Sequence, residues 1–172
     1  MTKARIFSGL AAISLAFGMT ACGGGAPEAP AQVAPEAPAG IAVTDGRFNL
    51  PAVAGNPGVV YFTIANSGED QATIRSVDMI GAGSAKLHET SEWNGQMDMQ
   101  ELFTVPVMAG ETVSFESGGK HVMVYDVDPS LAAGGETEVT LTFAGGDKIS
   151  FPVKILAAGD DGTMDHSGHE GM

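Results

Sequence analysis

Four side chains in the middle of the chain have the types and spacing of a soft metal site. His88 is separated by ten residues from Met99, and twenty-one further residues lie between Met99 and His121, which precedes Met123 by two positions. Imidazoles and thioethers form an uncharged, soft-to-borderline ligand set that suits Cu(I), whereas carboxylates and water suit Mg, Ca or Mn. In a strand, His121 and Met123 would point to the same face. These residues therefore predict a copper site.

Each of these residues also has a purely structural interpretation. Methionine often fills space in protein cores, and a single histidine can be a surface residue or a hydrogen-bonded core residue. Met97 adds another alternative, because it lies two residues before Met99 and would share its strand face. The residue types alone leave open which of these two methionines binds the metal.

The elements that must position these residues are short β-branched and aromatic runs, separated by Gly, Asn, Asp and Pro, within residues 41–156. Val139, Leu141 and Phe143 alternate with polar residues, as in a strand with one face on a core. Many short strands with regular turn signals predict an all-β sandwich. The expected strands are Ile41–Phe48, Val59–Ala65, Ala72–Met79, Ala85–Thr90, Met97–Phe103, Thr112–Phe115, His121–Tyr125, Thr137–Phe143 and Lys148–Ile155.

Residues 1–21 are expected to be a lipoprotein signal peptide. Two basic residues precede an apolar segment, Ile6–Met19, which is too short to span a bilayer comfortably. Cys22 is the only cysteine and follows directly, in a Met-Thr-Ala-Cys-Gly context that resembles a bacterial lipobox. We expect Cys22 to be lipidated and to anchor an exported, periplasm-facing protein, in the outer membrane if the source is Gram-negative. The alternative is ordinary cleavage near Ala21 with an incidental cysteine.

Two further segments flank the expected domain. Residues 22–40 are rich in Ala, Pro, Gly and Glu, and we expect this segment to be a disordered, extended linker. Residues 157–172 are expected to form a flexible tail that captures copper, including Cu(II) through its histidines. Its candidate ligands are Met164, His166, His169 and Met172. The alternative is a solvated acidic terminus.

The charge of the chain excludes one class of partner. Cleavage of the signal removes Lys3 and Arg5 and no acidic residue, which leaves 6 basic and 21 acidic residues and a formal charge of −15. Binding to nucleic acid requires basic patches, so we expect no nucleic-acid partner.

Around the candidate ligands the chain resembles the periplasmic copper chaperone family PCu(A)C, whose signature is H-x10-M-x21-H-x-M. The resemblance favours Met99 over Met97 and runs through the whole expected domain. The matching segments, in order, are Tyr61–Asn66, Leu87–Thr90, Gly95–Met99, Val105–Pro106, Gly118–Met123 and Val139–Phe143.

The resemblance implies a Greek-key, cupredoxin-like β-sandwich over residues 41–156 that binds one Cu(I) through His88, Met99, His121 and Met123. It further implies a monomer that delivers copper to an accepting protein, such as a cytochrome oxidase subunit during CuA assembly or a Sco-type assembly factor. The alternative is a copper-sequestering lipoprotein without a dedicated recipient. We expect no enzyme, because the domain has no cysteine pair and its two histidines are better used as ligands.

The chain departs from the family pattern at two positions. Ser117 stands where the family usually has proline before the Gly-Gly pair, and we expect it to loosen the loop that presents His121. Gln100 stands where the family usually has arginine, and we expect it to remove a positive charge near the site. Neither change affects a ligand.

Overall fold

The computed structural model describes residues 37–160, which fold into ten β-strands. Within that range there is no helix, and thus none that is long and apolar enough to cross a membrane. The strands are β1 (Ile41–Asn49), β2 (Gly58–Asn66), β3 (Ala72–Met79), β4 (Ala82–Trp93), β5 (Gln96–Glu101), β6 (Val105–Val107), β7 (Thr112–Phe115), β8 (Lys120–Val127), β9 (Glu136–Phe143) and β10 (Lys148–Leu156).

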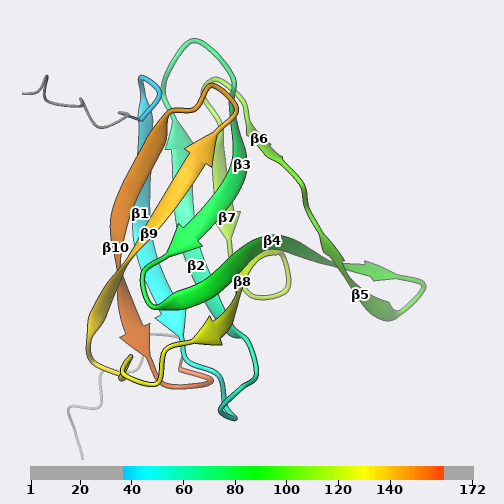
Figure 1. Ribbon diagram of the computed structural model, residues 1–172. Coiled ribbons are helices and arrows are strands. Elements are labelled where there is room, and N and C mark those ends of the chain that lie inside the picture. Colours follow the sequence, from blue (N-terminus) through cyan, green and yellow to red (C-terminus); the bar gives the residue numbers. More distant parts are fainter. Residues whose placement is uncertain (1–36, 161–172) are drawn as a thin grey trace, which may run out of the picture. The chain divides into compact units, whose positions relative to one another are not determined.

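All ten strands belong to one sheet, which curls around a single core (Figure 1). Their order is β5-β4-β8-β7-β2-β1-β10-β9-β3-β6, with an additional pairing between β8 and β2. Most neighbours are antiparallel, but β1 runs parallel to β10 and β7 runs parallel to β8. The order places β4, β5 and β8 side by side, which are the strands that carry the candidate ligands.

The core is built from the alternating apolar faces of these strands. Along β2 every second residue is buried, from Gly58 to Asn66. Phe62 stacks on Phe115 of β7, with ring centroids 4.2 Å apart, and lies 5.2 Å from the ring of Phe151 on β10. The alternation predicted for β9 is confirmed, since its three apolar residues are buried and its threonines are half-buried. The outer faces of the strands are therefore available for other roles.

The β4–β5 hairpin projects away from this core (Figure 1). Its strands are joined by Asn94 and Gly95, both at positive φ (52° and 75°), as required of a two-residue type I′ turn. All six residues of β5 are exposed. β5 therefore contributes little to the core, and the candidate ligands that it carries, Met97 and Met99, are open to solvent.

Candidate metal centre

Two histidines form the middle of the candidate site. His88 on β4 and His121 on β8 are direct partners in the antiparallel register. Their ring centroids are 6.0 Å apart and the ring planes are 28° from parallel. Leu87, which precedes His88, pairs with Val122, which follows His121, and both side chains are buried in the core. Since side chains alternate along a strand, the imidazoles share the opposite, outer face of the sheet.

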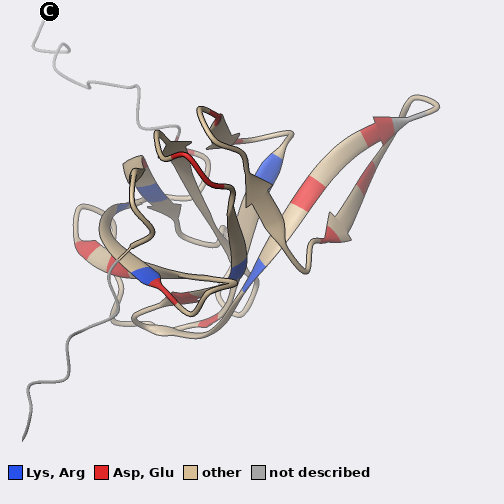
Figure 2. Cartoon of the chain, turned by 90° about the horizontal axis from the view of Figure 1, so that it is seen from above, with Lys and Arg blue, Asp and Glu red and all other residues tan. Residues whose placement is uncertain are grey.

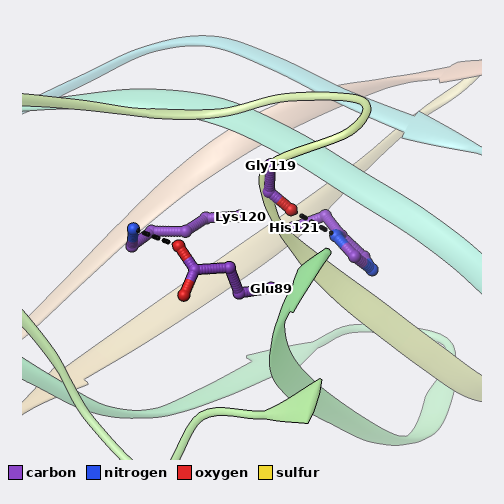
Figure 3. Close-up of polar contacts among 4 residues, drawn as sticks. All are labelled: Glu89, Gly119, Lys120 and His121. Atoms are coloured by element: carbon purple, nitrogen blue, oxygen red, sulfur yellow. Dashed lines mark hydrogen bonds and ion pairs between the residues drawn. The ribbon is translucent and has the colours of Figure 1, made fainter. Parts of the chain in front are cut away.

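The imidazole of His121 is held by the turn that precedes it. The ring is buried, and its Nδ1 lies 2.9 Å from the carbonyl oxygen of Gly119 (Figure 3). A carbonyl only accepts, so this hydrogen bond requires a proton on Nδ1 and leaves the lone pair on Nε2. The amide of Thr90 on β4 donates to the same carbonyl at 3.0 Å. The Gly119 carbonyl therefore fixes both the tautomer and the orientation of a potential ligand.

The imidazole of His88, unlike that of His121, is not held by a hydrogen bond within residues 37–160. Both of its ring nitrogens are buried, and neither has a hydrogen-bond partner among residues 37–160. Burial lowers the pKa of His88, and the neighbouring His121 lowers it further, although Glu101 raises it. The imidazole is thus favoured in its neutral form, which is the form that binds metals. A soft metal ion could bind the lone pair of one His88 nitrogen together with that of His121 Nε2.

The strand register brings both motif methionines to the same face. Met99 is the partner of Thr90, two residues beyond His88 on β4, and Met123 is the partner of Lys86, two residues before it. Each methionine is therefore a diagonal neighbour of His88 on an adjacent strand, at roughly 7–8 Å, which a long side chain can reach. Met123 is half-buried, whereas Met99 is 52% exposed.

Met97 also lies on this face but farther out. It is the partner of Glu92, near the hairpin turn, and it is 63% exposed. The register places it two residues farther from the histidine pair than Met99. The strand register therefore favours Met99 over Met97 as the methionine that could bind a metal ion together with the histidines.

Two ion pairs border the site. Lys86 binds Glu101, the β5 partner of His88, at 2.9 Å, and this pairing raises the pKa of Lys86. Lys120 binds Glu89 at 2.7 Å (Figure 3). These two residues are register partners next to the two histidines, so their side chains lie on the other face of the sheet. Both lysines near the site are thus neutralised. Figure 2 shows acidic segments on both strands of the hairpin.

The structure corrects one expectation about the departures from the family pattern and describes the turn that concerns the other. Gln100 is the partner of Glu89, so its side chain lies on the face opposite Met99 and the histidines. Its neutrality therefore does not remove a charge from the ligand face. The turn that contains Ser117 is closed by hydrogen bonds from Glu116 N to Lys120 O (2.7 Å) and from Gly119 N to Glu116 O (3.1 Å). The turn is therefore closed with serine at position 117, and the expected loosening stays a prediction.

The remaining predicted residues lie outside the described part of the chain, namely Cys22, Met164, His166, His169 and Met172. Within residues 37–160, no group of three or more His, Cys, Asp or Glu side chains is arranged to hold a metal ion.

The sequence did not predict the roles of Gly119, Lys86 and Glu101. Glu101 carried a usable signal, because it lies two residues after Met99 and shares its strand face.

Comparisons with known proteins agree with this architecture. A family described as "Putative lipoprotein LpqE-like" matches residues 41–155. The chain is 29% identical over 167 residues to the "Putative lipoprotein Lxx21020" of Leifsonia xyli subsp. xyli, which covers 94% of this chain and 98% of that protein.

Two solved structures of one domain share the fold. The apo PCuAC domain of PmoF2 superimposes with a TM-score of 0.60 at 17% identity, covering 73% of this chain and 97% of that domain. The copper-bound form of the same domain gives a TM-score of 0.57 at 16% identity, covering 72% and 97%. The predicted all-β, cupredoxin-like fold is thereby confirmed.

Proposed function

The chain belongs to the LpqE-like family, and on this premise we propose that it is an exported copper chaperone that carries one Cu(I) between His88, Met99, His121 and Met123. One of the solved domains that share its fold is a copper-bound PCuAC domain. The copper ion is cargo here, since a chaperone binds it in order to give it up.

The observation that carries this proposal is the pairing of unsatisfied nitrogens on one sheet face. His88 presents two buried nitrogens that have no partner in the described part of the chain, opposite His121, whose Nδ1–H bond to Gly119 leaves Nε2 free. A purely structural histidine pair would be expected to satisfy these atoms, because an unpaired buried polar group is costly. A bound metal ion would satisfy one His88 nitrogen, through its lone pair, and the Nε2 of His121.

The donor set supports Cu(I) as the cargo. Imidazole and thioether ligands are neutral and soft to borderline, so they favour a monovalent soft ion over a harder divalent one. Thioethers also cannot be oxidised to disulfides outside the cytoplasm, although they can become sulfoxides. Since the only cysteine is Cys22, the domain has no thiolate for a blue-copper electron-transfer site. We therefore propose carriage of copper, and neither electron transfer nor catalysis.

The exposed position of Met99 on β5 supports release as well as binding. His121 is buried and held by the turn, whereas Met99 lies on an exposed strand of a projecting hairpin. An accepting protein could replace this thioether first, while the histidines still hold the ion. Ligand exchange of this kind keeps the copper bound throughout the transfer.

The flanking segments extend the proposal. Lipidation of Cys22 would anchor the chain on the periplasmic side of a membrane, and residues 22–40 would tether the domain. Met164, His166, His169 and Met172 would collect copper, including Cu(II), for the domain. The proposed recipient is a cytochrome oxidase subunit or a Sco-type assembly factor.

The test is an anaerobic Cu(I) titration of the processed protein against a competing chelator. We expect a single tight site in the domain that is lost in the Met99→Ala/His121→Ala double variant. A variant with the four tail residues changed to alanine is the matched control and should keep this site. Equal Cu(I) binding by the double variant and the unaltered protein would contradict the proposal. A deletion strain then separates delivery from storage, since only delivery predicts loss of oxidase activity at low copper.

A further inference from the structure

The β4–β5 hairpin continues beyond the residues that the copper site needs. His88 lies near the base of the hairpin, yet the two strands continue to the turn at Asn94 and Gly95. All six residues of the β5 half are exposed among the residues that the structure describes. A segment that does not stabilise the core and projects from the domain is available for contact with another molecule (Figure 1).

Two thioethers lie in line on the ligand face of this hairpin. Met97 and Met99 are partners of Glu92 and Thr90, which share a strand face with His88. Successive positions on one face are about 6.8 Å apart along a strand. Each methionine has three rotatable bonds beyond its backbone and adapts readily to different positions. A metal ion could therefore move from one sulfur to the next.

The exposure of these methionines argues against a packing role. Met97 is 63% exposed and Met99 52%, whereas the core methionine Met79 is 7% exposed. Exposed apolar side chains grouped near a functional site commonly mark a contact surface. Met97 is the more exposed of the pair and lies nearer the tip.

The charge around Met97 also differs from that around Met99. Glu92, opposite Met97, forms no ion pair within residues 37–160, whereas Glu101 near the base is neutralised by Lys86. An unneutralised carboxylate raises the local concentration of cations. The outer thioether is thus the one beside which a cation would first accumulate.

From this arrangement we propose that Met97, with Glu92 opposite it, is an entry and exit station for Cu(I), separate from the resting site. The inference rests on the proposed copper-carrying function. On loading, a bond from the Met97 sulfur to copper forms as a bond to the donor breaks, and Met99 and the histidines then replace Met97. The ion stays Cu(I) in every step, and no proton or electron is transferred, since each thioether and imidazole binds the ion through a lone pair and exchanges one donor for another.

The proposal separates the rate of copper exchange from the affinity of the resting site. Met97→Leu keeps the apolar bulk and removes only the sulfur, and Met99→Leu is its matched control. With bicinchoninate as the Cu(I) acceptor, we expect Met97→Leu to retain the equilibrium affinity and to slow transfer by about tenfold. Met99→Leu should weaken the affinity itself. Glu92→Gln should slow transfer to a smaller, salt-dependent extent.

A second readout does not depend on transfer to a chelator. In protein labelled with 13C at the methionine methyl groups, substoichiometric Ag(I) serves as a redox-inert substitute for Cu(I). We expect the Met97 resonance to broaden by exchange, while Met99 shows separate free and bound signals. Amide spectra of both variants without metal check that the fold is retained.

The outcomes distinguish the two proposals. An unchanged transfer rate in Met97→Leu, or a loss of affinity as large as that in Met99→Leu, would overturn the station. Absence of tight Cu(I) binding by the unaltered protein would instead overturn the proposed function. Slower transfer at unchanged affinity supports both.

Discussion

His88 and His121 face each other across β4 and β8, but only His121 has a hydrogen-bond partner among the described residues. The Gly119 carbonyl holds His121, while both nitrogens of His88 are buried without a partner. The pair thus combines one preset ligand with one that the fold leaves unsatisfied. This asymmetry has consequences for stability as well as for copper binding.

Replacing His88 by leucine should stabilise the protein in the absence of metal. The substitution removes two buried, unsatisfied nitrogens, and we expect the free energy of unfolding to rise by about 1 kcal/mol. Urea unfolding of the metal-free protein measures this change. His121→Leu is the matched control, and it should destabilise by about 1 kcal/mol because it loses the bond to Gly119. Destabilisation by His88→Leu would show that the nitrogens of His88 are satisfied in solution.

The tautomer of His121 can be observed directly. In the neutral imidazole of the metal-free protein, we expect long-range 1H–15N spectra to show the proton of His121 on Nδ1, because the Gly119 carbonyl accepts that proton. Addition of Cu(I) should then shift Nε2 and leave Nδ1 protonated. Protonation of Nε2 in the metal-free state would contradict the proposed orientation of this ligand.

The ion pair between Lys86 and Glu101 should tune copper affinity through charge. Glu101→Gln leaves the Lys86 ammonium unneutralised beside the site. Since exposed ion pairs contribute little, we expect Cu(I) affinity to fall by about fivefold at most, with less effect at high salt. The double variant Lys86→Gln/Glu101→Gln restores neutrality and should restore affinity. A double variant as weak as Glu101→Gln would mean that Glu101 acts through something other than charge.

A turn remote from the site predicts how stability depends on pH. The Asp128 carboxylate accepts the backbone amide of Ser130 at 2.8 Å, and this bond, with the hydroxyl of Ser130, lowers the pKa of Asp128. A carboxyl whose pKa is lower in the folded state stabilises the fold above its unfolded pKa, and this contribution is lost as pH falls through the folded pKa.

Thermal unfolding at several pH values should therefore show Asp128→Ala less stable than the unaltered protein at pH 7, with the difference vanishing in acid. Asp128→Asn keeps an acceptor without the charge, so its stability should lack this pH dependence. A constant difference between Asp128→Ala and the unaltered protein down to the lowest pH would contradict the role of the carboxylate.

The strands that hold the site could be predicted because their side chains alternate, whereas their pairing could not. All nine expected strands occur, but β5 ends at Glu101 instead of Phe103, and β4 extends to Trp93. β4 also begins earlier, at Ala82, because its first residues pair with the end of β8. That pairing joins residues distant in sequence and leaves no local pattern. β6 was missed because it is three residues long and contains Pro106, which the edge of the sheet tolerates.

Within the site, the spacing predicted which residues share a face, and the register decided which are neighbours. Met97 and Met99 are equivalent by alternation, and only the pairing with Glu92 and Thr90 shows that Met97 lies farther out. The expectation for Gln100 was wrong because adjacency in sequence was taken as proximity, although neighbouring residues in a strand point to opposite faces. The Gly119 carbonyl is a backbone group and has no signature in the sequence.

X-ray absorption spectroscopy of the Cu(I)-loaded protein tests the central claim most directly. The sample should carry alanine at Met164, His166, His169 and Met172, so that the only copper observed is in the domain. We expect the copper edge of Cu(I) and a first shell of two nitrogen and two sulfur donors, with one sulfur lost in Met123→Leu. A shell of oxygen and nitrogen donors without sulfur, or a spectrum unchanged by Met123→Leu, would contradict the assignment of this face as the copper site.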